Sequence, residues 1–485
     1  ERFSPSGPLF GVQFSQLPCS DLVIHQNSAA VTVGPKRSPL GLAADPGGIP
    51  LYKGGEPVGA IGVISDGLYS IDPNIGDYDN DKDELIAMAG TVGFEPPFDI
   101  KGNRITVEGK NFRYTDRKIR SIRSNPLSAL PYDQIPRSVG GLTPIGTYFD
   151  GTIRPGTVFG TGPSGYRANT TGDYGTLNAF VLVDSNDQPR FPPRDGTEGT
   201  PESLTANEVR TIIRNALTIA FRARAQIRRP LGSHAQVTVS VVDTNGSILG
   251  IARTPDGPVF GTDVSLQKAR TAAFFSNTNT AADLIRANLG NYWLAAKAVL
   301  GPGALSDGTA FADRSGGNLS RPFFPDGIDG APHGPFSKPF SEWSPFNVGL
   351  QLDLIAANIV AHRSFLLGQS STDTPMNCTP IPVRPQTSKS PVANGIQIFP
   401  GSVPIYRNNT LIGGIGVSGD GIDQDDMISF LGLHNAGLEL GTGVGNAPRL
   451  IRADNLEVPG GRLRYVNCPF LPFLDSNEQT PCNGK

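Results

Sequence analysis

Charge is scarce in this sequence, and neither sign prevails. Only 18% of the 485 residues are charged, and 41 lysines and arginines face 44 aspartates and glutamates, for a formal net charge of −3. A chain without a basic excess cannot neutralise a run of phosphates, so we expect no nucleic-acid partner. No apolar run reaches the length of about 18 residues that a transmembrane helix needs, so we expect no membrane span.

Cysteine is rare as well. The four cysteines form no C-x-x-C pair, which excludes a zinc knuckle and covalent attachment of c-type haem. An even number, with two in a Pro/Asn-rich tail, favours disulfides in an exported protein. We expect the pairs Cys468–Cys482 and Cys19–Cys378, one of three possible pairings; four free thiols in a cytosolic protein are the alternative.

The beginning of the sequence fits the same interpretation. It starts with Glu and contains only three methionines, which is typical of a processed product whose signal peptide has been removed. We therefore expect a periplasmic or extracellular, that is secreted, protein.

Glycine and proline are abundant, with 59 and 43 residues, and they follow no short period. This excludes collagen, and 38% hydrophobic residues argues against wholesale disorder. We expect a large core that is threaded by many turns.

An internal repeat organises the chain. Residues 47–67 align without a gap with residues 401–421, with nine identities in 21 positions. Residues 103–114 align with residues 454–465, and both segments end in an Arg-Tyr pair. The repeat predicts a partial unit in 1–115, a Gly/Pro-rich connector in 116–202, a complete unit in 203–466 with an insertion at about 276–394, and a Cys-containing tail in 467–485.

The complete unit opens with a helix and a hairpin. Thr205 and Glu208 form a capping box, and apolar residues follow at helical spacing. Residues 236–243 alternate as a strand, Asn245-Gly246 supplies the turn, and the next strand and a shorter helix follow. The partial unit has no counterpart of this half. We therefore expect a homo-oligomer, or a partner chain or segment that completes the first unit.

This succession of motifs, with V-V-D-x-x-G, K-A-R-T-A-A and I-G-G-I-G-V-S-G-D, resembles the GlcG/HbpS-like family, also found as the C-terminal domain of PduO-type proteins. The resemblance covers about 203–275 and 395–437, and the half-unit at 47–90. It implies an α/β (α+β) fold with a central antiparallel sheet flanked by helices, and frequent oligomers. It also implies haem or tetrapyrrole binding in some members, and proposed haem degradation.

Three polar residues fall on family-like positions: Arg253, Asp256 and Lys268. They could form an anion-binding rim for propionates or another carboxylate. The alternative is an Arg–Asp pair that closes the hairpin beside a solvated lysine. The sequence R-T-P-D-G departs from the family's R-x-D-G by one residue.

Four aspartates alternate in the first unit: Asp77, Asp79, Asp81 and Asp83. They match the first ligand steps of a calcium loop, but Lys82 stands where an EF-hand has glycine, and the twelfth position lacks a glutamate. An irregular calcium site and a solvated acidic helix cap remain as alternatives.

Catalytic motifs are absent, including G-x-S-x-G and H-E-x-x-H. None of the five histidines, His25, His234, His333, His362 and His434, lies in a motif of an axial haem ligand. The glycines of the two G-x-I-G-V segments favour close helix–strand packing or a bulge over a phosphate loop. We expect an exported binding protein for haem or another small anion. The alternatives are a structural subunit of an extracellular assembly or filament, and a haem-degrading enzyme.

Overall fold

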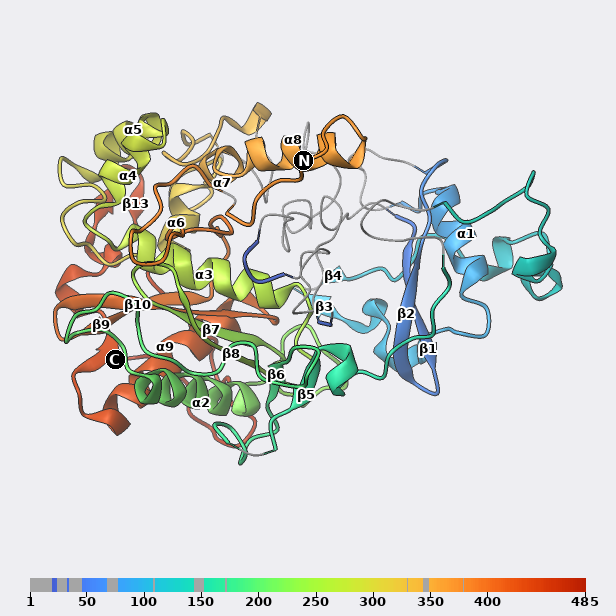
Figure 1. The fold of residues 1–485 in the computed structure, drawn as a ribbon, viewed down its shortest axis with the longest axis horizontal. Coiled ribbons are helices and arrows are strands. Elements are labelled where there is room, and N and C mark those ends of the chain that lie inside the picture. The colour runs from blue at the N-terminus through green and yellow to red at the C-terminus, as the bar shows by residue number, and fades with distance from the viewer. Residues whose placement is uncertain are drawn as a thin grey trace.

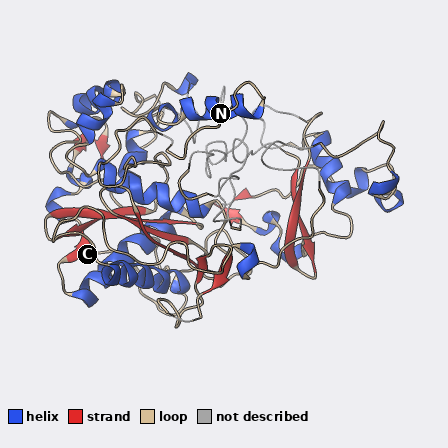
Figure 2. Cartoon of the chain, in the orientation of Figure 1, coloured by secondary structure: helices blue, strands red, loops and turns tan. Residues whose placement is uncertain are grey.

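The structure is a computed structural model, and its largest feature is an antiparallel sheet with helices on both faces (Figures 1 and 2). The residues that the structure describes are 20–23, 33–34, 46–67, 77–107, 110–143, 152–170, 172–328, 330–342, 349–377 and 379–485. The predicted class, α/β with a central antiparallel sheet, is therefore confirmed. No helix in these residues is long and apolar enough to cross a membrane.

The sheet has seven strands, and every pairing in it is antiparallel. The predicted hairpin lies near its middle, because β7 pairs with β8 around a turn in which Gly246 has a φ of 76°. The order of the strands is β11 (Val444–Asn446), β9 (Ser402–Arg407), β10 (Thr410–Ser418), β7 (Thr238–Val242), β8 (Ile248–Arg253), β6 (Phe180–Leu182) and β5 (Tyr166–Ala168).

Two helices lie together on one face, α2 (Ala206–Arg222) and α9 (Ile422–Leu440), and α3 (Gly261–Phe275) covers the other (Figure 1). The predicted capping box is present at the start of α2, where Thr205 and Glu208 bond to each other's backbone N–H groups. The apolar stripe of α2 is buried in the main core between sheet and helices.

Glycines of β10 allow α3 to lie directly on the sheet. A Cβ atom on Gly416 would lie 2.0 Å from the carbonyl oxygen of Ser265, and one on Gly414 would lie 2.2 Å from that of Ala269. A register shift between Leu411 and Gly413 adds a bulge. The strand glycines thus serve helix–strand packing, as their positions in the sequence predict.

The described residues of 276–394 form a helical layer around a second core, which also takes in the end of α3 and apolar residues between 396 and 463. Its helices are α4 (Thr280–Arg286), α5 (Gly290–Leu300), α6 (Asp313–Leu319), α7 (Leu350–Asp353) and α8 (Ala356–Leu366). Part of the expected connector, 116–202, joins the sheet as β5 and β6. These strands are only three residues long, too short for a periodic signal in the sequence.

The first unit contains a two-stranded sheet, β1 (Gly48–Lys53) and β2 (Glu56–Gly62), the helix α1 (Lys82–Gly90) and the hairpin of β3 (Thr106–Val107) and β4 (Lys110–Asn111). Figure 1 shows β1, β2 and α1 apart from the seven-stranded sheet. The same succession occurs in β9, β10, α9 and the hairpin of β12 (Glu457–Val458) and β13 (Gly461–Arg462).

Short 3-10 helices also follow this order. In the first unit they are η2 (Phe98–Ile100) and η3 (Gly102–Arg104), and in the second they are η9 (Arg449–Ile451) and η10 (Ala453–Asn455). The others are η4 (Ile119–Ser121), η5 (Pro126–Ser128), η6 (Tyr132–Gln134), η7 (Gly162–Ser164) and η8 (Phe340–Glu342).

A disulfide joins Cys468 to Cys482 in the tail, with a Cα–Cα distance of 6.3 Å, as predicted. The predicted partners Cys19 and Cys378 lie outside the described residues.

Candidate functional site

The three residues expected to form an anion-binding rim lie in different environments. Arg253 is buried at the end of β8, where its guanidinium lies 4.6 Å from the centre of the Tyr166 ring and burial lowers its pKa. Asp256 is exposed and forms an ion pair with Arg228. Lys268 is buried between α3 and β10. The expected rim therefore does not form, because α3 packs on the glycines of β10 and turns Lys268 into the core.

Lys268 instead belongs to a buried ionic network. Its Nζ donates to the carbonyl oxygen of Val417 at 2.9 Å and to Oδ2 of Asp425 at 3.0 Å. Asp425 stands in the first turn of α9, where the helix dipole favours negative charge. The pair thus ties α3 to β10 and α9.

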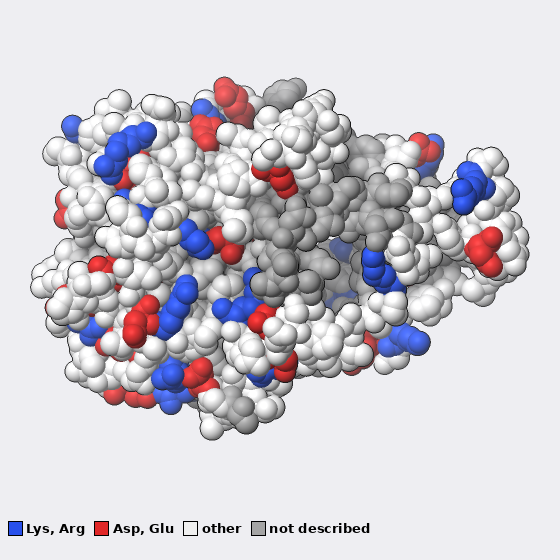
Figure 3. All heavy atoms as spheres, in the orientation of Figure 1, with Lys and Arg blue, Asp and Glu red and all other residues white. Residues whose placement is uncertain are grey.

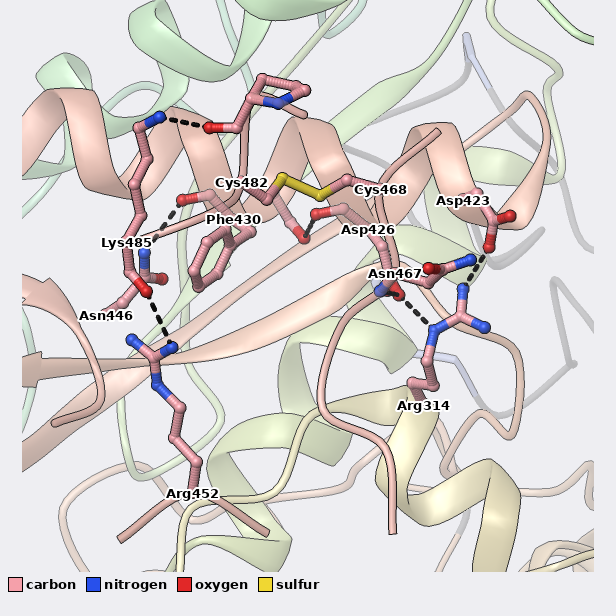
Figure 4. The surroundings of a disulfide bond; sticks show 12 residues. Arg314, Asp423, Asp426, Phe430, Asn446, Arg452, Asn467, Cys468, Cys482 and Lys485 are labelled. Atoms are coloured by element: carbon pink, nitrogen blue, oxygen red, sulfur yellow. Dashed lines mark hydrogen bonds and ion pairs between the residues drawn. A yellow bond between two sulfur atoms is a disulfide. The ribbon is translucent and has the colours of Figure 1, made fainter. Parts of the chain in front are cut away.

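Arg314 of α6 forms the second part of this network. It donates to Oδ2 of Asp426 at 2.5 Å and to Oδ1 of Asp423 at 2.6 Å, and Asp426 also accepts the backbone N–H of Asn467 at 2.9 Å (Figure 4). Asp313 is fully buried next to this group.

Burial raises the pKa of these acids, although their cationic partners oppose it. The pKa of Asp425 rises to about 7 and that of Asp426 to about 6, and the pKa of Asp313 is raised well above its ordinary value. Such groups can hold a proton near neutral pH. Neither of the two cavities discussed next is lined by Lys268 or Asp425. We therefore regard this network as a support of the fold.

A cavity of about 770 Å³ lies in the first unit. Aromatic and cationic side chains share its lining, and we call it the aromatic–basic cavity. The aromatic residues are Tyr78, Phe98, Phe112 and Tyr114, and the cationic residues are Lys101, Arg113, Arg117 and Lys118.

The cations of this cavity stand against its rings. The Nζ of Lys101 lies 5.1 Å from the centre of the Tyr114 ring, and the guanidinium of Arg113 lies 5.0 Å from that of Tyr78. Within the described part of the chain, Oη of Tyr114 and Nε of Arg117 are buried without a hydrogen-bond partner. Burial also raises the pKa of Tyr114, which keeps its phenol neutral. Both atoms can form a hydrogen bond with water or with a polar ligand.

Glu84 of α1 fixes this wall. Its two carboxylate oxygens accept the backbone N–H groups of Asp116, at 3.2 Å, and Arg117, at 2.7 Å. Burial raises the pKa of Glu84. In the second unit Asp426 accepts the N–H of Asn467 in the same manner.

The corresponding place in the second unit holds a cavity of about 560 Å³ that the tail lines. Arg452 stands 5.2 Å from the centre of the Tyr465 ring, as Lys101 stands near Tyr114. The backbone oxygen of Lys485 accepts a hydrogen bond from Arg452 at 3.1 Å (Figure 4). The same oxygen also accepts hydrogen bonds from Arg449. In the second unit, an oxygen of the chain itself therefore serves as the hydrogen-bond acceptor for the cationic side chains of the cavity.

Two of the four aspartates considered for calcium lie close together, since a Cβ atom on Gly67 would lie 2.9 Å from Oδ2 of Asp81 and 2.8 Å from Oδ2 of Asp83. Asp81 caps α1 by accepting the N–H of Glu84 at 2.7 Å, and Asp83 accepts the N–H groups of Ser65 and Asp66. Asp77 is exposed, and Asp79 is half-buried. No group of three or more His, Cys, Asp or Glu in the described ranges could hold a metal ion. The structure therefore gives calcium no support, and helix capping accounts for Asp81.

The histidines have local partners. His362 is buried and its Nδ1 lies 2.7 Å from Asp373, while the ring of His234 lies 4.8 Å from that of Phe221 at a tilt of 57°. The Nδ1 of His333 lies 3.0 Å from the carbonyl oxygen of Gly334. His434 is partly buried on α9, and His25 lies outside the described residues. None of the four described histidines lines the aromatic–basic cavity.

Sequence reasoning missed this cavity. Its one available signal was the repeated Arg-Tyr pair, Arg113-Tyr114 and Arg464-Tyr465, because the tyrosine of each pair lines a cavity. No sequence pattern pointed to Lys101. It lies near Tyr114 only because the chain between them folds back in the β3–β4 hairpin.

The seven-stranded sheet and its helices form an antiparallel α/β domain, with α3 on one face and α2 and α9 on the other. Residues 356–433 of this domain match the family model described as "Haem degrading protein HbpS-like". The chain therefore carries a GlcG/HbpS-like domain, as its motifs predicted. The match begins in α8, inside the stretch expected to be an insertion.

Two solved structures are similar. One is a PduOC:heme complex, at 17% identity and a TM-score of 0.22, covering 50% of this chain and 99% of the other. The second is protein ORFY of Klebsiella pneumoniae, at 17% identity and a TM-score of 0.23, covering 50% and 94%. TM-scores this low add nothing to the family match. No curated protein matches the chain significantly.

Proposed function

We propose that the protein binds a planar ligand that carries carboxylates, haem or another tetrapyrrole, in the aromatic–basic cavity. The observation that carries this proposal is the lining of the cavity, in which four cations stand among aromatic rings. Aromatic faces stack on a macrocycle, and Lys or Arg pairs with its propionates. The family match supports the same ligand class, because the description of the family names haem.

The residues present fit haem in three respects. Lys101 and Arg117 could hold propionates, and Nε of Arg117 is a buried donor without a partner among the described residues. Tyr114 and Met88 also line the cavity and are of types that ligate haem iron in other proteins. Bound haem would supply an iron centre for redox or oxygen chemistry. The chain's own residues would bind and orient it.

We propose binding, in an exported protein, as the function. The Cys468–Cys482 disulfide supports export, because such bonds persist in oxidising compartments. The family description also names degradation, so the catalytic alternative must be tested with the same ligand. A structural role in an assembly is supported by a different observation, the uncovered face of β2 described in the next subsection.

A haem titration of the full chain, followed by absorbance, tests this function. We expect a saturable shift of the Soret band, and Lys101→Ala should weaken binding by about tenfold or more, since a charge-assisted hydrogen bond contributes about 1.5–3 kcal/mol. Tyr114→Phe should alter the spectrum if its oxygen ligates iron. Lys297→Ala, an exposed lysine beside Trp293 of α5, is the matched control and should bind like wild type.

The outcomes separate the alternatives. A Soret band that persists under reductant and oxygen supports binding, and a band that disappears with turnover supports degradation. Absence of a saturable shift, or equal weakening by Lys101→Ala and Lys297→Ala, would contradict the proposed site.

A further inference from the structure

Among the residues that the structure describes, none lies on the face of β2 that corresponds to the α3-covered face of β10. Strands β1 and β2 match β9 and β10 in length, spacing and pairing, up to the end of β2. By this alignment Gly62 stands where β10 has Gly416. A Cβ atom on Gly416 would lie 2.0 Å from the backbone of α3, whereas one on Gly62 would meet nothing within 4 Å.

Apolar side chains close to Gly62 along the chain are exposed. Val58 is 56% exposed and Ile64 is 78% exposed. Their counterparts in the second unit, Ile412 and Ser418, are 2% and 4% exposed. Exposed apolar residues of this kind are suited to contact with another polypeptide.

The outer edge of β2 is open as well. In the second unit β10 pairs with β9 on one side and with β7 on the other. Among the described residues, β2 pairs only with β1. An unpaired strand edge offers a row of N–H and C=O groups to another strand.

An acidic residue stands at the same place in both units. A Cβ atom on Gly47 would lie 3.1 Å from Cβ of Asp83, and one on Gly401 would lie 2.9 Å from Cβ of Asp425. Both acids accept a backbone N–H from the preceding turn. In the second unit this acid also receives Lys268 from α3.

We propose that β2 is the docking site for a partner polypeptide segment with the strand–helix pattern of β7 and α3. The strand of the partner pairs antiparallel with β2, and the small-residue face of its helix packs on Gly62. The helix lies further from β2 than α3 does from β10, because Ala60 stands where Gly414 contacts α3.

A second copy of residues 1–485 does not fit this role. Its own β7 and α3 are already held in its seven-stranded sheet, with α3 buried along its whole length. The partner is therefore a separate segment of the same pattern. This docking site is independent of the aromatic–basic cavity, so ligand binding and partner binding can fail separately.

A peptide of residues 236–275, which spans β7, β8 and α3, is the probe. We expect a fluorescein-labelled peptide to bind the full chain with saturable anisotropy. Gly62→Val, which places a branched side chain under the partner helix, should weaken binding at least tenfold. Gly445→Val is the matched control, because it makes the same change in β11, where a Cβ atom also meets nothing within 4 Å.

Circular dichroism shows whether each variant is folded, and Val58→Lys is a second variant in β2. Absence of saturable binding would overturn the proposal, and so would equal affinity for wild type, Gly62→Val and Val58→Lys. Sedimentation velocity measures the oligomeric state of the chain alone. If the chain alone forms a dimer that Gly62→Val abolishes, the occupant is a second copy and the proposal is wrong.

Discussion

Replacing Lys268 by methionine should destabilise the protein, and the loss should grow with pH. The variant keeps the apolar stem but removes the ammonium that donates to Val417 and Asp425. The side chains of Lys268 and Asp425 are only 2% and 3% exposed, so water cannot replace the lost partner. Breaking a buried ion pair costs about 3–5 kcal/mol, and we expect a loss of this size in the free energy of unfolding at pH 8.

The pKa of Asp425 determines the sign of the pH dependence. Burial raises this pKa from 3.8 to about 7 in the folded protein, although Lys268 opposes the rise. Between these values the folded state binds more protons than the unfolded state, so stability falls as the pH rises. Without Lys268 the folded pKa rises further, and the fall continues above pH 7. The difference between variant and wild type should therefore grow there by up to about 1.4 kcal/mol per pH unit.

Urea unfolding followed by far-UV circular dichroism at pH 5.5, 7.0 and 8.5 measures this difference. Lys297→Met is the matched control, since Lys297 is exposed, and it should change the free energy of unfolding by less than about 0.5 kcal/mol. A loss below about 1 kcal/mol for Lys268→Met, or a loss that is the same at pH 7.0 and pH 8.5, would refute the buried pair.

Two further predictions concern the strand glycines and the tail. Gly416→Val should destabilise or prevent folding, by about 3 kcal/mol or more, because its Cβ atom would lie 2.0 Å from α3, whereas Gly62→Val should cost less than about 1 kcal/mol. Chemical denaturation measures the free energy of unfolding of both variants. Equal losses in the two would contradict the conclusion that Gly416 is covered by a helix and Gly62 is not. Replacing Cys468 and Cys482 by alanine removes a cross-link with a sequence separation of 14, worth about 3 kcal/mol. Residues 467–485 should then be cleaved faster in limited proteolysis, and an unchanged rate would show that other contacts hold the tail.

The elements that the sequence predicted correctly are those with local signals. The capping box at Thr205 and the hairpin turn at Gly246 depend on residues close in the chain, and both are present. The edge strands β5 and β6 were missed because three residues show no alternation. The surface charges agree with the composition, since acidic and basic residues are interspersed on the face in Figure 3.

The environment of Lys268 could not be predicted from local pattern. A lysine on a short helix is typically solvated, but every residue of α3 is buried. One side of α3 rests on the glycines of β10, and residues far along the chain cover the other, as when Gln267 and Arg270 bond to Asn394. The aromatic–basic cavity was missed for a different reason, because most of its lining comes from turns and short hairpins between residues 78 and 119 that follow no periodic pattern.

Amide hydrogen exchange of the chain alone tests the central claim most directly, namely that one unit is closed while β2 of the other is open. The account predicts strong protection throughout Gly414–Gly416 of β10, which is paired on both edges. It predicts fast exchange for the β2 amides that point away from β1, while those bonded to β1 are protected. Uniform protection of Glu56–Gly62 at the level of β10 would contradict it.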